Sequence, residues 1–408
     1  MTLEMPVETE ARTVTVARLF AAGPNADLDR HLACFGGLDV KARAGALPDE
    51  LEASALSGRG GAGFPAWRKL RALTDRRAER GRRPVVIANG AEGEPLSDKD
   101  RMLLTHAPHL VIDGLLAMAA VVRTKSLYVY ASEPGLSAMR AAANERADAC
   151  GIRFVEAPDA FITGQATAVV NAIENGIATP RDHVDHLTET GLKRRPTLLH
   201  NVETLAHVAL IARYGATWFR SVGAPDDPGT RLVSISGDVR RPQVLEVVGG
   251  ASITDILRAA GADTARLSAA LVGGYHGTWL ARDDLTAPLS PAGLAPLGGH
   301  PGAGIIHALD RTRCGLGATA DIIEYLAAQS ARQCGPCRFG LPALAESWRG
   351  IAGGYGPHGP ARRIADSVDG RGACAHPDGT ARLSRSAMSV FADDVREHAS
   401  GRCRRAAH

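Results

Sequence analysis

Short apolar segments alternate with longer helical segments through the first half of the chain, and few folds accommodate such an alternation. Apolar, strand-like runs occupy residues 84–88, 126–131 and 152–156, and helical patterns occupy residues 108–123, 137–150 and 164–175. Parallel strands need a long crossover connection, usually a helix, so repeated strand–helix–strand units favour one largely parallel sheet. The sequence therefore predicts the α/β class for residues 51–228.

The remaining parts of the chain differ from this region in their pattern of strand-like and helical segments. Residues 229–300 contain two β-rich pieces, at 230–237 and 243–248, and a helix at 252–260, as expected of a small α+β module. A segment rich in proline and glycine, 287–304, leads into a helical region at 301–408 that is broken at 350–360. Residues 1–50 contain one expected strand, 13–20, and are predicted to pack on the first domain.

Charge and hydropathy exclude several classes of protein. The 47 Lys and Arg residues nearly balance the 44 Asp and Glu residues, and no basic run is interleaved with aromatic residues, so we expect no nucleic-acid partner. The longest apolar stretch, 109–122, contains Asp113 and is shorter than the roughly 20 residues that span a bilayer. The N-terminus lacks the apolar core of a secretory signal. We predict a cytoplasmic protein without a membrane span.

A glycine-rich run at residues 57–65, S-G-R-G-G-A-G-F-P, is the strongest local signal. Glycines let the backbone approach a flat or phosphorylated ligand closely and turn its N–H groups toward it. Arg59 and Lys69 add cations that suit phosphate. The run does not follow an apolar strand, so the ordinary dinucleotide fingerprint does not fit, and a plain glycine turn before a helix remains an alternative.

Polar side chains follow the strand at 85–88. Asn89, Glu92 and Glu94 come directly after it, and in open α/β sheets ligands bind outside the carboxyl ends of the strands. Amide and carboxylate groups suit the hydroxyls of ribityl and ribose chains, although a capped helix start with solvated acids is the simpler reading. Two further polar loops, 162–167 and 200–204, precede helices, whose N-termini could bind an anion. Taken singly, each loop is better explained by a structural role than by ligand binding.

The cysteines favour metal or thiol chemistry over disulfides, because their number, seven, is odd and they are thinly spread. Cys334 and Cys337 form a C-x-x-C turn that brings two thiolates to one side, and Cys374 lies further along. The pair fits a redox dithiol, half of a zinc site or half of an iron-sulfur site. With His376, the three cysteines would also make a Cys3His zinc site.

Taken in order, these motifs resemble the flavin-binding, NADH-oxidising F subunits of respiratory complex I and the related flavoprotein subunits of NAD-reducing hydrogenases and formate dehydrogenases. The resemblance covers residues 50–398. Its segments are similar to the family's G-R-G-G-A-G-F-P…K (58–69), N-A-D-E-G-E-P (89–95), K-D-R (99–101), P-H-L (108–110), P-T…N-N-V-E-T-L (196–205), G-T-K-L…S-G…P-G (229–242), S-C-G-x-C-x-P-C-R (330–338) and C-A-x-x-D-G (374–379). The ordered set is far more specific than any single motif.

The resemblance implies a Rossmann-like FMN-binding α/β domain, then a β-grasp (SLBB, ubiquitin-like) module and a C-terminal helical bundle that binds a 4Fe-4S cluster. NADH would transfer hydride to FMN, and single electrons would pass through the cluster to ferredoxin-like or other redox subunits, or to a membrane-bound partner. The predicted domains are therefore 51–228 for FMN and NADH, 229–300 for the β-grasp module and 301–408 for the cluster.

Carried over residue by residue, the resemblance also implies the site. The residues that would contact FMN are Gly58, Arg59, Gly60, Gly61, Gly63, Lys69, Asn89, Glu92, Asn201 and Thr204. Phe64 would stack against the nucleotide, and Glu94 would contact NADH. The cluster ligands would be Cys334, Cys337 and Cys374.

The chain departs from the family pattern at several of these positions. Ala331 stands where the first cluster cysteine is expected, and Cys314 and Cys403 are conceivable substitutes. The pocket loses three carboxylates and one asparagine, at positions Ala91, Gln165, Ala166 and His200. The loop 89–92, N-G-A-E, is closer to that of the Rnf-complex C subunit. Two alternatives to an NADH dehydrogenase subunit therefore stay open: an electron-transfer or scaffold subunit without NADH turnover, and a structural zinc protein.

Overall fold

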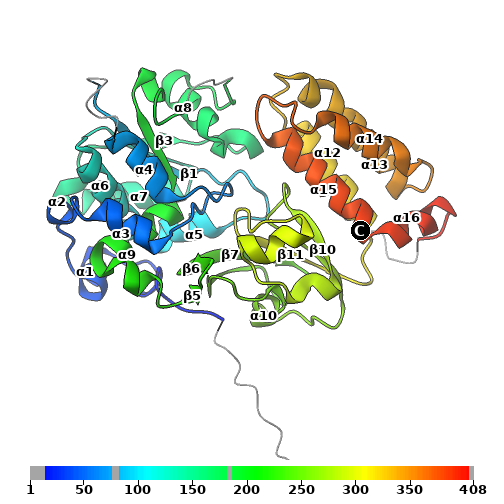
Figure 1. The fold of residues 1–408 in the computed structure, drawn as a ribbon, viewed down its shortest axis with the longest axis horizontal. Helices are drawn as coiled ribbons and strands as arrows, with labels where there is room; N and C mark the ends of the chain where they lie inside the picture. Colours follow the sequence, from blue (N-terminus) through cyan, green and yellow to red (C-terminus); the bar gives the residue numbers. More distant parts are fainter. Residues whose placement is uncertain (1–13, 76–81, 182–185, 404–408) are drawn as a thin grey trace, which may run out of the picture.

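The computed structural model describes residues 14–75, 82–181 and 186–403, which form three parts (Figure 1). An α/β domain and a C-terminal group of helices lie at opposite ends of the long axis in Figure 1, and a second sheet lies between and below them. This arrangement agrees with the predicted order of an α/β domain, a β-rich module and a helical bundle. It also brings segments distant in sequence around one central region.

The first sheet has four parallel strands, as the alternation of segments predicts. Its strands run in the order β3-β2-β1-β4, with bounds Ile152–Glu156, Leu127–Ala131, Val85–Gly90 and Thr197–Asn201. Neighbouring strands pair in parallel throughout. The sequence predicts β1, β2 and β3 but not β4, which has only the apolar pair Leu198 and Leu199 at its centre.

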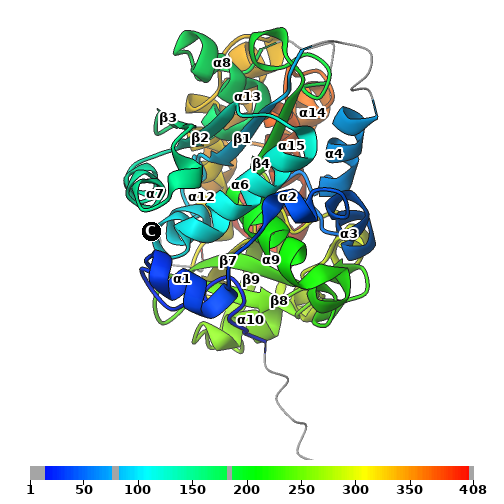
Figure 2. The ribbon, with the colours of Figure 1, turned by 90° about the vertical axis from the view of Figure 1, so that its left-hand side faces the viewer.

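Helices cover both faces of this sheet, so its strands are apolar on both sides. Val86 and Ala88 point into one core, which they share with α6 (Pro108–Val122) and α9 (Val202–Phe219). The alternate residues of β1 point into a second core beneath α8 (Ala166–Asn175). Figure 2 shows α6 passing over the first of these faces. The other helices of the domain are α4 (Ala66–Thr74), α5 (Lys99–His106) and α7 (Gly135–Asn144).

The helices of the N-terminal segment pack on this domain, whereas residues 14–16 lie along residues 246–248, to which their backbone is hydrogen-bonded. These helices are α1 (Leu28–Phe35), α2 (Val40–Arg43) and α3 (Leu47–Ser54), of which α2 packs against α6 and α3 against α9. The prediction of a strand at 13–20 is wrong for the described residues 14–20. Of these residues, only Thr15 forms an isolated bridge, to Val247. The carboxylate of Glu246 instead accepts hydrogen bonds from the backbone of Arg18 and Leu19, which satisfies these donors without a ladder.

The second sheet has five strands in the order β10-β9-β11-β7-β8. Their bounds are Thr278–Ala281, Leu267–Val272, Ile305–Asp310, Thr230–Gly237 and Gln243–Val248, and α10 (Ile253–Ala259) packs beside them. The central strand, β11, lies beyond the module boundary predicted at residue 300. The segment 287–304 is therefore a loop within this module, carrying the short helix α11 (Pro291–Leu294), and the sheet ends at Asp310. Two short strands, β5 (Gly223–Ala224) and β6 (Asp227–Pro228), precede the sheet.

The C-terminal region is helical, as predicted. Its helices are α12 (Gly315–Ala328), α13 (Leu341–Ala352), α14 (His358–Val368), α15 (His376–Val390) and α16 (Ala392–Ala399). They share a core around the fully buried Trp348, and the break between α13 and α14 falls inside the predicted 350–360. Within the described ranges, no single helix is long and apolar enough to cross a membrane; only α5 and α6 together reach that length and apolarity, and they bend by 94° between them.

Candidate functional site

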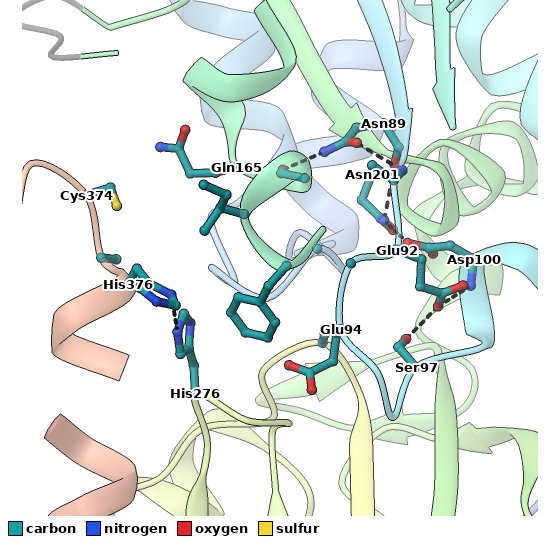
Figure 3. Close-up of a pocket in the computed structure, with 18 of the residues that line it drawn as sticks. Asn89, Glu92, Glu94, Ser97, Asp100, Gln165, Asn201, His276, Cys374 and His376 are labelled. Atoms are coloured by element: carbon teal, nitrogen blue, oxygen red, sulfur yellow. Dashed lines mark hydrogen bonds between the residues drawn. The ribbon is translucent and has the colours of Figure 1, made fainter. Parts of the chain in front are cut away.

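A pocket opens at the carboxyl ends of β1 and β4, where ligands bind in open α/β sheets (Figure 3). Its empty volume, including space open to solvent, is about 920 Å³. Of the residues predicted from the sequence, it is lined by Gly60, Asn89, Glu92, Glu94, Asn201 and Cys374. Side chains of all three parts of the chain thus meet around one space.

Two asparagines fix the loops at the strand ends. Asn89 and Asn201 are neighbours in the register of β1 and β4, and the amide of Asn201 donates to the backbone oxygen of Asn89 at 3.3 Å. The amide of Asn89 donates to the carbonyl of Gly164 at 2.9 Å, which holds the loop before α8 against the end of β1. Asn201 also donates to the carboxylate of Asp100, at 2.6 Å. The side chains that line the pocket here are therefore held in place by the protein itself.

Glu92 lines the pocket and also caps α5. Its carboxylate accepts hydrogen bonds from the backbone N–H groups of Asp100 at 3.0 Å and Arg101 at 2.9 Å. The first N–H groups of a helix lack partners within the helix, and this carboxylate supplies acceptors for two of them. The strand end and the start of α5 are thereby joined around the pocket.

Glu94 links the pocket to the second sheet. Its carboxyl oxygens lie 3.2 and 3.1 Å from the backbone nitrogen of Tyr275, which donates to them. Burial raises the pKa of Glu94 to about 8, more than the hydrogen bonds from the backbone of Tyr275 and Leu96 lower it. The carboxyl group is consequently protonated at neutral pH, so it can donate a hydrogen bond to a bound ligand.

An aromatic wall, formed by Phe161, His276 and His376, closes another side of the pocket. The rings of Phe161 and His276 meet edge to face with centroids 4.7 Å apart. Nε2 of His276 lies 3.0 Å from Nδ1 of His376, whose Nε2 lies 2.9 Å from the carbonyl oxygen of Leu326. Neither Phe161 nor His276 is predicted from the sequence; the one available signal is that Phe161 directly precedes the polar loop at 162–167.

The glycines of the 57–65 run serve different purposes. Gly60 lines the pocket, and a Cβ atom there would lie 3.1 Å from Cβ of Asn201. Gly61 and Gly63 have φ angles of +100° and +63°, which L side chains rarely adopt. A Cβ on Gly58 would lie 3.0 Å from the carbonyl oxygen of Phe64, so this glycine permits the close turn itself.

Arg59 and Thr204 are buried and make contacts within the protein, and neither lines the pocket. The guanidinium of Arg59 is buried, pairs with Asp227 at 3.0 Å and donates to the carbonyl oxygen of Thr230 at 3.0 Å. Thr204 is fully buried and accepts a hydrogen bond from the backbone N–H of Arg59 at 2.9 Å. A buried guanidinium needs such partners to offset its desolvation. Arg59 thereby joins the α/β domain to the strands that follow it, and Thr204 holds the backbone of Arg59.

Lys69 is a half-buried cation of another kind. Its ammonium donates to the carbonyl oxygen of Leu199 at 3.2 Å and lies 5.9 Å from the ring centroid of Phe64. Burial lowers the pKa of Lys69, and no carboxylate among the described residues offsets this effect. Phe64 leaves 45% of its surface exposed, although neither residue lines the pocket itself. Lys69 is therefore placed to pair with an anionic ligand.

The three predicted cluster cysteines lie close to one another, at the edge of the pocket. Cys337 lies in a π-helical turn, Pro336–Gly340, where burial and the neighbouring Cys334 raise its pKa to about 12. Cys374 precedes α15 and lines the pocket. Among the described residues the three sulfurs do not all lie within 4.8 Å of one another.

His376 does not complete a zinc site with these cysteines, contrary to that alternative. Both of its ring nitrogens already face hydrogen-bonding partners, His276 and the carbonyl oxygen of Leu326. A ligating histidine must present one nitrogen lone pair to the metal. The histidine instead belongs to the aromatic wall.

Known proteins match the chain over most of its length. The family described as "Nuo51 FMN-binding domain" matches residues 51–210, and "NADH-ubiquinone oxidoreductase-F iron-sulfur binding region" matches residues 317–398. The chain is 30% identical to the F 2 subunit of the NADH-quinone oxidoreductase of Rhizobium meliloti, over 86% of this chain and 89% of that protein. It is 30% identical to the F subunit of the NADH-quinone oxidoreductase of Mycobacterium bovis, over 85% of this chain and 83% of that protein.

The fold also matches a solved structure. The crystal structure of an NAD+-reducing [NiFe]-hydrogenase in the H2-reduced state superposes on 88% of this chain with a TM-score of 0.80 and 26% identity. The chain spans 64% of that hydrogenase chain. The match supports both the order of the three parts and their mutual arrangement.

Proposed function

Because the chain belongs to the family of NADH-quinone oxidoreductase F subunits, we propose that its pocket binds FMN, receives hydride from NADH and passes electrons to an iron-sulfur centre. The chain has the FMN-binding domain and the iron-sulfur binding region of this family. It is an oxidoreductase of the NADH dehydrogenase type.

One observation carries the proposal: the two regions share a pocket. Asn89, Glu92 and Glu94 of the FMN-binding side lie opposite Cys374 and His376 of the iron-sulfur side (Figure 3). Electrons released from a flavin in this pocket would reach a cluster bound by Cys374 without crossing the molecule. The close approach explains why the chain folds three separate parts around one cavity.

The residues present fit FMN. Bound FMN would supply the chemistry, accepting hydride from NADH and releasing single electrons. Gly60 leaves room for the backbone to approach the flavin, and Lys69 would balance its negative charge. Glu94, protonated at neutral pH, would donate a hydrogen bond to the nucleotide, and the exposed ring of Phe64 would stack against it. Asn89 and Asn201 hold the strand ends that position these groups.

The cysteines fit an iron-sulfur centre with one unusual ligand. Cys334, Cys337 and Cys374 supply three sulfurs, and we propose that the fourth position, where Ala331 stands, is filled by a ligand other than cysteine. Cys314 and Cys403, the two conceivable substitutes, do not lie where a fourth cluster ligand is needed. Cys314 caps the N-terminus of α12, whereas Cys334 follows its C-terminus, and a helix of 14 residues separates its ends by roughly 20 Å. Cys403 lies beside Cys314.

Partners follow from the chemistry. The named relatives are subunits of larger enzymes, so redox partner subunits are implied for this chain. A ferredoxin-like or membrane-bound acceptor, the absence of nucleic-acid binding and a cytoplasmic location stay predictions.

The proposal is tested by anaerobic purification followed by absorption spectroscopy and metal analysis. We expect flavin bands that bleach on addition of NADH, together with bound iron. Flavin bands that bleach with dithionite but not with NADH would instead identify an electron-transfer subunit without NADH turnover. A colourless protein that contains zinc and no iron would overturn the proposal entirely.

A further inference from the structure

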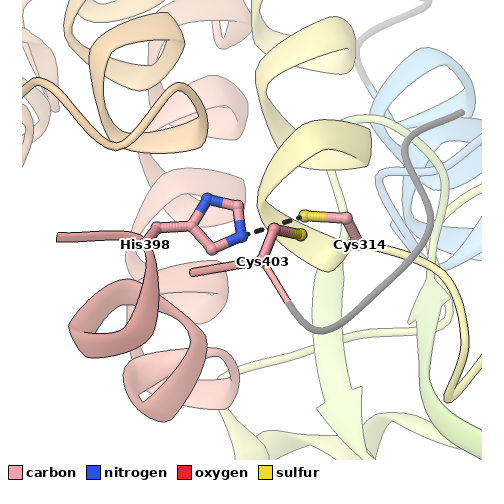
Figure 4. A group of neighbouring side chains, drawn as sticks. All are labelled: Cys314, His398 and Cys403. Atoms are coloured by element: carbon pink, nitrogen blue, oxygen red, sulfur yellow. Dashed lines mark hydrogen bonds between the residues drawn. The ribbon is translucent and has the colours of Figure 1, made fainter. Parts of the chain in front are cut away.

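We propose that Cys314, His398 and Cys403 form a second metal site, of the kind that binds zinc, at the C-terminal end of the molecule (Figure 4). Among the described residues, these three make up the one group of histidine, cysteine or carboxylate side chains whose ligand atoms all lie within 4.8 Å of one another. Figure 4 shows the two sulfurs and the imidazole directed toward a common space. Neither the FMN nor the iron-sulfur chemistry makes use of these residues.

The distances suit a tetrahedral ion. Sγ of Cys314 lies 3.6 Å from Nε2 of His398. Zinc binds sulfur at about 2.3 Å and imidazole nitrogen at about 2.0 Å, so two such ligands at the tetrahedral angle lie roughly 3.5 Å apart. The two groups are therefore spaced for a common ion without rearrangement of the backbone.

The histidine is oriented as a ligand. Nδ1 of His398 lies 2.8 Å from the carbonyl oxygen of Ala352, so this nitrogen carries the proton and donates it there. The lone pair then resides on Nε2, which faces the sulfur of Cys314. A backbone carbonyl that fixes the far nitrogen of a ligating histidine is a common feature of metal sites.

Burial raises the pKa of the Cys314 thiol, and the helix N-terminus that it caps offsets part of this effect. Cys314 is the N-cap of α12, and its sulfur accepts a hydrogen bond from the backbone N–H of Gly317 at 3.4 Å. Helix N-termini stabilise thiolates. Binding of a divalent ion would convert the thiols of Cys314 and Cys403 to thiolates, and their two protons would pass to solvent.

The ligand types and their exposure define the metal. Two sulfurs and one imidazole nitrogen select zinc or a similar ion over magnesium or calcium, which prefer oxygen. Cys314 and His398 are buried, whereas Cys403 is exposed, so the fourth position faces solvent and would hold water. Such an ion would tie the end of α16 and the chain beyond it to the start of α12.

The test measures zinc per chain in the anaerobically purified full-length protein, by elemental analysis, in wild type and three variants. We expect about one zinc per wild-type chain, and its loss in Cys403→Ser. Cys34→Ser, which removes another exposed cysteine, should keep the zinc. Cys374→Ser should also keep it, because this cysteine belongs to the other group. Cys403 is exposed and follows the last helix, so its replacement by serine leaves the core intact.

A second readout uses cobalt. Cobalt(II) added to zinc-free protein should give the intense sulfur-to-cobalt charge-transfer absorption of a thiolate site, and Cys403→Ser should lose most of this absorption. Three results would overturn the proposal: zinc that persists in Cys403→Ser, zinc that disappears in Cys374→Ser alone, or a wild-type chain without zinc in which mass spectrometry finds Cys314 and Cys403 joined by a disulfide.

Discussion

At the scale of single residues, Lys69 is the cation that we expect to bind FMN. Its half-buried ammonium lies beside a carbonyl oxygen, and no carboxylate among the described residues pairs with it. We expect Lys69→Met to weaken FMN binding by roughly 10- to 100-fold, because a charge-assisted hydrogen bond contributes about 1.5–3 kcal/mol. The measurement is FMN titration of flavin-free protein. Arg68→Met removes the same charge from an exposed neighbour and should change little; equal effects of the two changes would contradict the role of Lys69.

Glu94 should impose a pH dependence on NADH binding. Its pKa is raised to about 8 because it is buried, so the group is neutral at pH 7 and becomes negative as the pH rises through 8. The new charge would repel the pyrophosphate of NADH, and the KM for NADH should therefore rise above pH 8. Glu94→Gln stays neutral and should abolish this rise, whereas Glu156→Gln, at the exposed end of β3, should leave it unchanged. A rise that persists in Glu94→Gln would show that another group titrates.

Arg59, in the glycine-rich run, and Lys69, just after it, show how far ligand contacts can be predicted from sequence. Arg59 and Lys69 are equally plausible phosphate ligands by composition and spacing. Arg59 nevertheless pairs with Asp227, which lies 168 residues away, and no local pattern indicates that contact. Asn89 and Glu92 are found from sequence because they directly follow a recognisable strand. Phe161 and His276 are missed because only the folded chain brings them to the pocket.

At the scale of elements, the crossing of α6 and α9 depends on Gly114. A Cβ atom there would lie 1.9 Å from the carbonyl oxygen of Leu205, which is backbone and cannot turn aside. We expect Gly114→Ala to lower the free energy of unfolding by about 1–3 kcal/mol, the usual range for overpacking, as measured by chemical denaturation. Gly359→Ala in α14 would meet only the end of the Arg363 side chain and should be neutral or slightly stabilising. A Gly114→Ala variant as stable as wild type would contradict this account of the crossing.

The elements that the sequence predicts are those with strong local patterns. Strands β1, β2 and β3 are short apolar runs between helices, and they form as expected. Strand β4 is missed because its apolar core is only two residues long and it obtains its order from pairing with β1. Strand β11 lies outside the predicted module because the preceding segment, rich in proline and glycine, reads as a linker. The structure shows that this segment is a loop between two strands of one sheet.

At the scale of the whole molecule, the central feature is the pocket between the FMN-binding and iron-sulfur regions. Sequence motifs predict both regions, but not that Cys374 lines the same cavity as Asn89 and Glu94. That contact depends on the second sheet, which holds the helices against the α/β domain through contacts such as that of Tyr275 with Glu94. If the pocket performs hydride transfer, electrons have a short route to the cysteines.

An anaerobic titration with NADH, comparing wild type with Cys337→Ser by absorption spectroscopy, tests this claim most directly. Cys337 is a proposed cluster ligand, buried among the C-terminal helices, and its loss should remove iron but leave the flavin. The account predicts that NADH bleaches the flavin in both proteins, and that the variant takes up one electron fewer per flavin. Flavin that stays oxidised in wild type under excess NADH, or equal electron uptake by the two proteins, would contradict it.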